Sequence, residues 1–103
     1  MGQRTLKRKI IQALKPSFSG NRERIVVLDA FEELLHLFVV SDRFKGKNYD
    51  EIGDMIVPIL WEKLEREEWG SICLVKGLAW NEVNGFEPEL VEALKRKKRL
   101  ARK

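Results

Sequence analysis

The segment from residue 34 to residue 40 constrains the fold most, because six of its seven residues are apolar and only His36 is polar. In an extended strand, alternate side chains point to opposite faces. Leu35, Leu37 and Val39 then share one face, and the other face carries Leu34, His36, Phe38 and Val40. Both faces of such a strand are largely covered, or His36 is exposed. A turn at residues 31–33 would pair it with the strand-type run at residues 25–28 in a hairpin.

The same region also admits a helix. Asp29 and Glu32 have the spacing of a capping box. Four apolar side chains then lie on one helical face: Phe31, Leu34, Leu35 and Phe38. The dense run of strand-type residues at 37–40 favours the hairpin, and the local pattern leaves both alternatives open.

The pattern that begins at Asn48 indicates the main core helix, because its apolar side chains recur every three or four residues. Pro58 lies inside this pattern, where a proline removes a backbone hydrogen bond and costs about 3 kcal/mol. We therefore expect a kink, or a break into two short helices, near Val57. We interpret Trp61, on the same helix, as a core residue.

The remaining elements follow from shorter patterns. Residues 5–14 have helical spacing, with Thr5 as the expected N-cap. A third strand is predicted at residues 72–75 and continues past Gly77. Pro88 opens a last helix.

The resulting order is helix, strand, strand, helix, strand, helix. This α-β-β-α-β-α arrangement belongs to the α+β class, with a small three-stranded mixed sheet packed against helices. A chain of 103 residues fits one compact core. We assign residues 1–94 to a single α/β domain and residues 95–103 to a basic C-terminal helix end or tail.

The net charge of +4 hides a separation along the chain. Residues 1–22 hold six Lys or Arg and no acidic residue, and residues 95–103 hold seven and none. The ends therefore carry 13 positive charges. Residues 23–94 hold the other 7 basic and all 16 acidic side chains, a net charge of −9. Basic ends attract anionic partners, most often nucleic acid, although they also serve as solvated tails.

Residues able to perform chemistry are few. His36 has no thiol or hydroxyl beside it in the sequence, and it lies 37 residues from Cys73, so neither a catalytic triad nor a clustered metal site is indicated. Gly46 and Lys47 lack the other residues of a phosphate-binding loop. The single cysteine fits a reducing compartment, so we expect a cytoplasmic protein with Cys73 buried and inert. No apolar stretch approaches the ~20 residues of a membrane-spanning helix.

Aromatic side chains offer a second kind of binding surface, because unpaired bases stack on them. Trp69 and Trp80 are predicted to lie beside turns. These two residues are therefore the better candidates for a partner surface.

A turn between the predicted second strand and the main helix has the pattern Ser-x-x-Phe-x-Gly-Lys, with matching residues Ser41, Phe44, Gly46 and Lys47. This stretch resembles the BolA family. Downstream apolar residues fall where that family keeps the core of its central helix: Met55, Ile56 and Leu60. The likeness extends over about residues 5 to 80.

The resemblance implies a fold related to the type II KH domain, which favours the hairpin over a helix at residues 30–38. In the family, an Arg-His-Arg group supplies a histidine that helps ligate an iron–sulfur cluster shared with a monothiol glutaredoxin. The aligned residues here are Ile52, Gly53 and Asp54. The histidine is absent, and we expect no cofactor and no metal.

Our first hypothesis is a non-enzymatic, BolA-like regulatory protein that binds nucleic acid through its basic ends. The expected phosphate contacts are Lys7, Arg8, Lys9, Lys95, Arg96, Lys97, Lys98 and Arg99. The alternative is a protein adaptor in iron–sulfur or redox metabolism that meets a glutaredoxin-like partner through a turn made of Ser41, Phe44, Gly46 and Lys47. A third possibility is a homodimer formed by an exposed edge of the small sheet.

Overall fold

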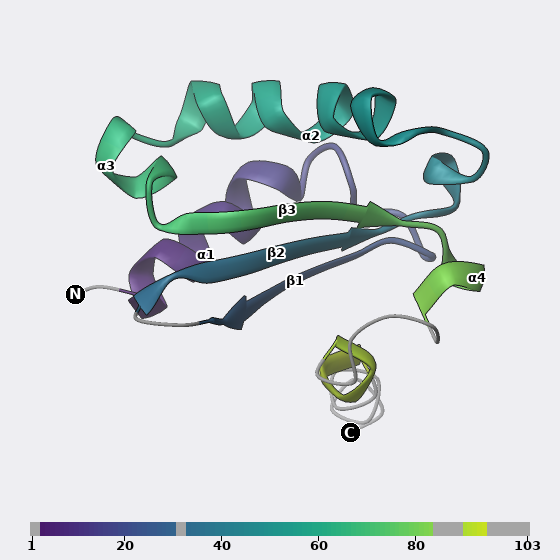
Figure 1. The fold of residues 1–103 in the computed structure, drawn as a ribbon, viewed down its shortest axis with the longest axis horizontal. Coiled ribbons are helices and arrows are strands. Elements are labelled where there is room, and N and C mark those ends of the chain that lie inside the picture. The colour runs from purple at the N-terminus through teal and green to yellow at the C-terminus, as the bar shows by residue number, and fades with distance from the viewer. Residues whose placement is uncertain (1–2, 31–32, 84–89, 95–103) are drawn as a thin grey trace.

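The computed structural model describes residues 3–30, 33–83 and 90–94 (Figure 1). Within these residues the larger elements are α1 (Gln3–Leu14), β1 (Arg24–Asp29), β2 (Leu35–Val40), α2 (Tyr49–Lys63) and β3 (Ile72–Leu78). Three short helical turns accompany them: η2 (Asp42–Phe44), α3 (Arg66–Trp69) and α4 (Trp80–Val83). Residues 90–94 are also helical, and Pro88, the expected start of that helix, lies outside the described residues.

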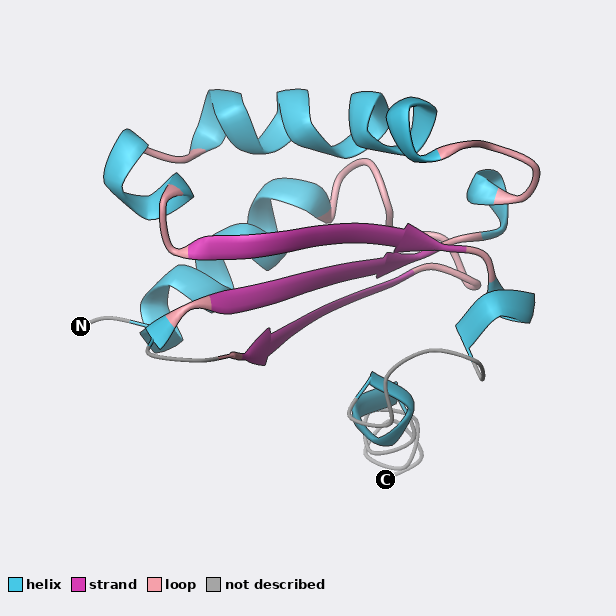
Figure 2. Cartoon of the chain, in the orientation of Figure 1, coloured by secondary structure: helices cyan, strands magenta, loops and turns pink. Residues whose placement is uncertain are grey.

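The three strands form one mixed sheet in the order β1-β2-β3 (Figure 2). β1 and β2 pair antiparallel, with Ile25 opposite Val39 and Asp29 opposite Leu35. β2 and β3 pair in parallel, with Val40 opposite Leu78. The α+β class, the mixed sheet and the hairpin are therefore confirmed, and a helix over residues 30–38 is excluded.

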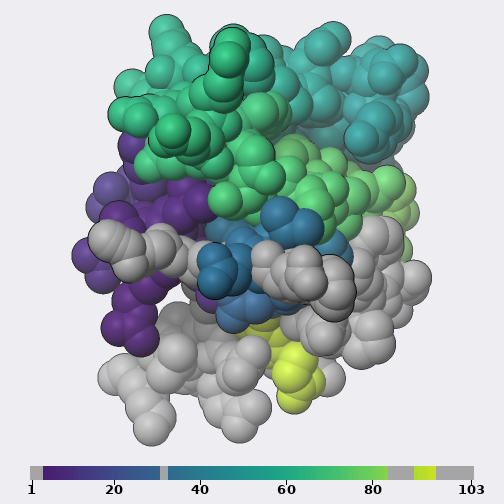
Figure 3. Space-filling model, turned by 60° about the vertical axis from the view of Figure 1, so that its left-hand side comes forward, coloured from purple at the N-terminus to yellow at the C-terminus, as the bar shows by residue number. Residues whose placement is uncertain are grey.

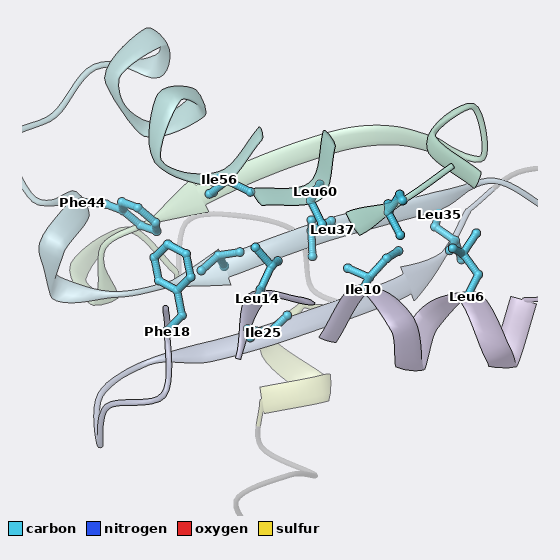
Figure 4. Close-up of a cluster of buried hydrophobic side chains, with 12 residues drawn as sticks. Leu6, Ile10, Leu14, Phe18, Ile25, Leu35, Leu37, Phe44, Ile56 and Leu60 are labelled. Carbon is cyan, nitrogen blue, oxygen red and sulfur yellow. The ribbon is translucent and has the colours of Figure 1, made fainter. Parts of the chain in front are cut away.

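The central strand β2 is buried on both faces, because Leu37, Phe38, Val39 and Val40 are each fully inaccessible to solvent. On one face, Leu35, Leu37 and Val39 join a core cluster with the apolar sides of α1 and α2. In Figure 4, the helical side chains of this cluster point toward the sheet from both helices, including Ile10 and Leu60. This face holds the larger of the two clusters.

The opposite face of the sheet has its own apolar cover. Phe38 and Val40 pack there with Val26 of β1 and Leu78 of β3. Val83 of α4 and Leu90 close this cluster. Residues 80–83 and 90–94 therefore supply the second layer that the apolar pattern of β2 requires.

Two details of the helices differ from the prediction. α1 begins at Gln3, so Thr5 lies inside the helix instead of capping it. α2 runs without a break through Pro58, so the predicted alternative of two short helices is wrong. The N–H that a proline lacks would have bonded to the carbonyl of Asp54. Pro58 and Asp54 are both exposed, so that carbonyl lies on the side of the helix that faces water.

Two side chains expected in the core are exposed. Trp61 is 67% exposed, because the core face of α2 is formed by Ile56 and Leu60, and the next residue lies about 100° away around the helix. Its ring packs edge-on against Trp69, with 5.7 Å between centroids. Cys73 is exposed because it is the extra residue of a β-bulge: Ile72 and Leu74 lie opposite successive residues of β2, which leaves Cys73 unpaired.

Gly77 allows α2 to pack closely against β3. A Cβ atom at this position would lie 2.3 Å from Cγ2 of Ile52 and 2.9 Å from Cε2 of Phe44. Gly53 in α2 is the opposite case, because a Cβ atom there would meet nothing within 4 Å.

We predict that Gly77→Ala lowers the free energy of unfolding by about 1–3 kcal/mol, the usual cost of overpacking a core. Gly53→Ala is the matched control and should raise that free energy by about 0.5–1 kcal/mol, because alanine favours a helix over glycine. Urea unfolding followed by circular dichroism measures both. A Gly77→Ala variant as stable as the wild type would contradict the close packing of α2 on β3.

Candidate binding surfaces

The turn that follows β2 is held by a hydrogen-bond network around Ser41, whose side chain is fully buried. The Ser41 hydroxyl accepts a bond of 3.1 Å from the backbone N–H of Arg43, and so caps η2. It donates a bond of 2.7 Å to Oε2 of Glu23. The same carboxylate oxygen accepts Nε of Arg43 at 2.8 Å. The start of β1 and the turn after β2 are therefore fastened together.

Aromatic packing adds to this network of Glu23, Ser41 and Arg43, which we call the Glu23 clamp. The guanidinium of Arg43 lies over the ring of Phe18, 4.6 Å from its centroid, and bonds to the carbonyl of Ser17. Phe18 in turn contacts Phe44, with 5.8 Å between ring centroids (Figure 4). Phe44 is only 1% exposed. Its ring anchors the turn inside the main core.

The carboxylate of Glu23 is the centre of the network, and its side chain is only 13% exposed. Burial on its own would raise the pKa of Glu23. Three donors outweigh this effect: the backbone N–H of Gly20, the Ser41 hydroxyl and the Arg43 guanidinium. The pKa of Glu23 is consequently lower than its ordinary value, and the clamp is strongest with the carboxylate ionised.

The predicted partner-binding turn therefore divides into two kinds of residue. Ser41 and Phe44 are buried and shape the turn. Gly46 and Lys47 are exposed, together with Lys45. Gly46 has a φ of 79°, in the left-handed region that favours glycine. A partner that meets this turn contacts the exposed residues 45–47.

A groove lies next to this turn, between the N-terminal half of α2 and β3. It has a volume of about 750 Å³. Its apolar lining includes Ile52 and Val57 of α2 and Val75 of β3. Gly53 lies on the α2 side and leaves open space where a side chain would project.

Charged groups of both signs line the groove. The cations are Lys47 and Lys76, and the ammonium of Lys76 lies 5.5 Å from the centroid of the Tyr49 ring. The acidic residues are Asp50, Asp54 and Glu82. Glu82 accepts the backbone N–H of Ala79 at 2.9 Å. The groove is thus lined by three acidic and two basic side chains.

The basic residues of α1 do not all point freely into solvent. Nζ of Lys7 lies 2.9 Å from Asp29, and Nζ of Lys9 lies 2.8 Å from Glu68. The pKa of Glu68 is lowered, first by the backbone N–H of Glu65 and then by Lys9. Arg8 is exposed on the same helix. Figure 3 shows α1 at the surface on this side of the molecule, with the α3 region above it.

The basic residues at the other end lie outside the described residues: Lys95, Arg96, Lys97, Lys98 and Arg99.

The two tryptophans expected at a partner surface, Trp69 and Trp80, are both half-buried. Trp69 packs against Trp61. The indole N–H of Trp80 donates to the carbonyl of Arg22 at 2.6 Å, and the guanidinium of Arg22 lies 5.3 Å from the Trp80 ring. Both indoles therefore take part in contacts within the protein.

Two absences hold within the described ranges. In residues 3–30, 33–83 and 90–94, no three His, Cys, Asp or Glu side chains gather to hold a metal ion. Across those same ranges, no helix is long and apolar enough to cross a membrane.

Comparison with known proteins adds no assignment. Neither the protein-family models nor the curated proteins match the sequence.

Sequence reasoning missed the groove and the Glu23 clamp. The groove depends on the distance between α2 and β3, which no local pattern contains. The sequence placed Gly53 in the main helix and Gly77 in the third strand, without indicating that the two face one groove. The clamp had a weak signal, because Glu23 and Arg43 flank the two strands of the predicted hairpin on the same end.

We predict that Glu23→Gln lowers the free energy of unfolding at pH 7 by about 1.5–3 kcal/mol, the range for hydrogen bonds to a charged group. The folded-state pKa of Glu23 lies below the unfolded value of about 4.5. Its stabilisation is therefore fully present above pH 4.5 and is lost as the pH falls through the folded-state pKa. Urea unfolding at several pH values should show the difference between the two proteins shrinking in acid.

Glu62→Gln is the matched control for this prediction, because Glu62 is exposed at the far end of α2. It should change stability by less than about 0.5 kcal/mol, as surface substitutions usually do. A Glu23→Gln variant whose deficit is the same at pH 7 and in strong acid would contradict the assigned role of the carboxylate.

Proposed function

We propose that this protein is a non-enzymatic, BolA-like binding module that binds nucleic acid through its basic ends. The observation that carries the proposal is the separation of charge: 13 positive charges lie at the two ends of a body with a net charge of −9. Phosphate backbones are bound by such clusters through counterion release, without sequence preference.

Side chains of α1 support this proposal. Arg4 and Arg8 are exposed on the helix. Lys7 and Lys9 are held in ion pairs whose members retain contact with solvent, since their side chains are 31% and 39% exposed. Such surface pairs are worth about 0–1 kcal/mol, so a phosphate can replace the carboxylate at little cost.

A second candidate function is a protein adaptor, for example for a glutaredoxin-like partner in iron–sulfur or redox metabolism. The exposed residues 45–47 favour it, because they project from a turn that is rigidly held by Glu23, Ser41 and Arg43. A rigid exposed turn loses little conformational entropy when a partner binds. This adaptor would not itself ligate a cluster.

We predict salt-dependent binding of single-stranded RNA and DNA by the full chain in a fluorescence anisotropy titration. Substituting alanine for all five basic residues from 95 to 99 should weaken the affinity. It should also reduce the slope of log K against log salt by about 3–4, because each phosphate contact with a single strand contributes about 0.7.

The control removes positive charge from the acidic body instead. Lys63 and Lys45 are exposed there, and changing both to alanine should leave the slope nearly unchanged. No binding at ~50 mM salt, or binding that does not depend on salt, would rule out the nucleic-acid proposal.

A further inference from the structure

The strand β3 has one edge without a partner strand in the described part of the chain, because the sheet order is β1-β2-β3. The carbonyl of Leu78 faces β2, where it accepts the backbone N–H of Ser41 at 2.9 Å. In a strand of a parallel pair, alternate residues direct their backbone groups to opposite sides. The N–H and C=O of Val75 therefore point away from β2, toward the groove.

This edge is open at one end and closed at the other. Cys73 is exposed and Val75 is half-buried, whereas Gly77 is buried beneath Ile52 and Phe44. Gly53 leaves open space on the α2 side of the groove. An unpaired strand edge beside an open apolar groove is the arrangement that accepts an added peptide strand.

The charges of the groove select the chemistry of the occupant. Asp50 and Asp54 are four residues apart and so lie on the same face of α2. Both are exposed, and neither side-chain carboxylate has a hydrogen bond or ion pair within the described ranges. One of the two cations, Lys76, is engaged with the ring of Tyr49, and Lys47 is exposed. These carboxylates would repel the phosphate backbone of a nucleic acid, whereas a Lys or Arg side chain would form ion pairs with them.

The shape of the groove favours a single extended segment over a second folded copy. β3 of another copy carries its own α2 packed against it through Gly77 and Ile52. Two such strands could not pair edge to edge in this groove without a clash between their helices. A segment with no helix of its own avoids that clash.

We propose that the groove between α2 and β3 binds an extended segment of a partner protein, in which apolar and basic residues alternate, as a fourth strand on the edge of β3. Gly77 is covered by Ile52 and Phe44, so the added strand pairs with the open part of the edge, at Val75, and its flanking residues lie along the groove. Its basic side chains pair with Asp50 and Asp54. This inference does not depend on nucleic-acid binding by the basic ends, because it concerns a different surface and a partner of opposite charge.

The test is an NMR titration of the full-length, ¹⁵N-labelled protein with acetyl-Lys-Val-Lys-Val-Lys-amide. We expect saturable shifts of the amide signals of Gly53, Val75 and Gly77. The peptide acetyl-Glu-Val-Glu-Val-Glu-amide should bind at least tenfold more weakly. N-methylation of both valines of the basic peptide should have a similar effect, because it removes backbone donors.

Variants separate the groove from the rest of the surface. Gly53→Trp should weaken binding of the basic peptide at least tenfold by filling the groove, whereas Glu62→Trp, which adds the same side chain elsewhere on α2, should not. The double variant Asp50→Lys, Asp54→Lys should prefer the acidic peptide, and this reversal does not require Gly53→Trp to fold. The variant with alanine at residues 95–99 should bind the basic peptide as the wild type does.

Three results would overturn the proposal. One is equal binding of the basic and acidic peptides. The second is shifts that leave Val75 and Gly53 unaffected. The third is saturation of the same amides by an oligothymidylate but not by the basic peptide, which would assign the groove to nucleic acid.

Discussion

The burial of β2 on both faces is the constraint on which the rest of the structure depends. Residues 37–40 have no face that tolerates water, so each side of the strand needs an apolar layer. α1 and α2 supply one layer, and α4 with residues 90–94 supplies the other. β1 and β3 flank the strand in the sheet. Each larger element therefore either packs on a face of β2 or pairs with one of its edges.

The clamp at Glu23 connects this core to the surfaces that can meet a partner. It fixes the chain as it leaves β2, and the turn that follows leads directly to Asn48, the N-cap of α2. Asn48 and Glu51 form a reciprocal capping box with bonds of 2.9 and 2.8 Å. The first turn of α2 carries Asp50, and it forms one wall of the groove. The largely buried carboxylate of Glu23 thus holds the chain segment that leads into this wall.

The features predicted from the sequence are those that local patterns determine. The apolar spacing after Asn48 was enough to predict the main helix, and the dense strand-type run at residues 37–40 favoured the hairpin without excluding a helix. The failures concern features that depend on contacts between elements. Trp61 is apolar and lies on the core helix, but its angle around α2 places it in solvent. Cys73 is exposed because of a bulge, whose existence depends on the register between β2 and β3. The groove depends on Gly77 and Ile52, which lie 25 positions apart in the sequence.

The parallel pairing of β2 with β3 has a consequence for the order of folding. β1 and β2 form a local hairpin, whereas β3 can reach β2 only after about 30 intervening residues have closed a loop, a step with an entropic cost. The hairpin can therefore form early, and the docking of β3 comes with the completed fold. Because the groove has β3 as one wall, it exists only in the fully folded chain. Any ligand of the groove thus binds the native state alone. The free energy of unfolding therefore rises with the logarithm of the ligand concentration once that concentration exceeds the Kd.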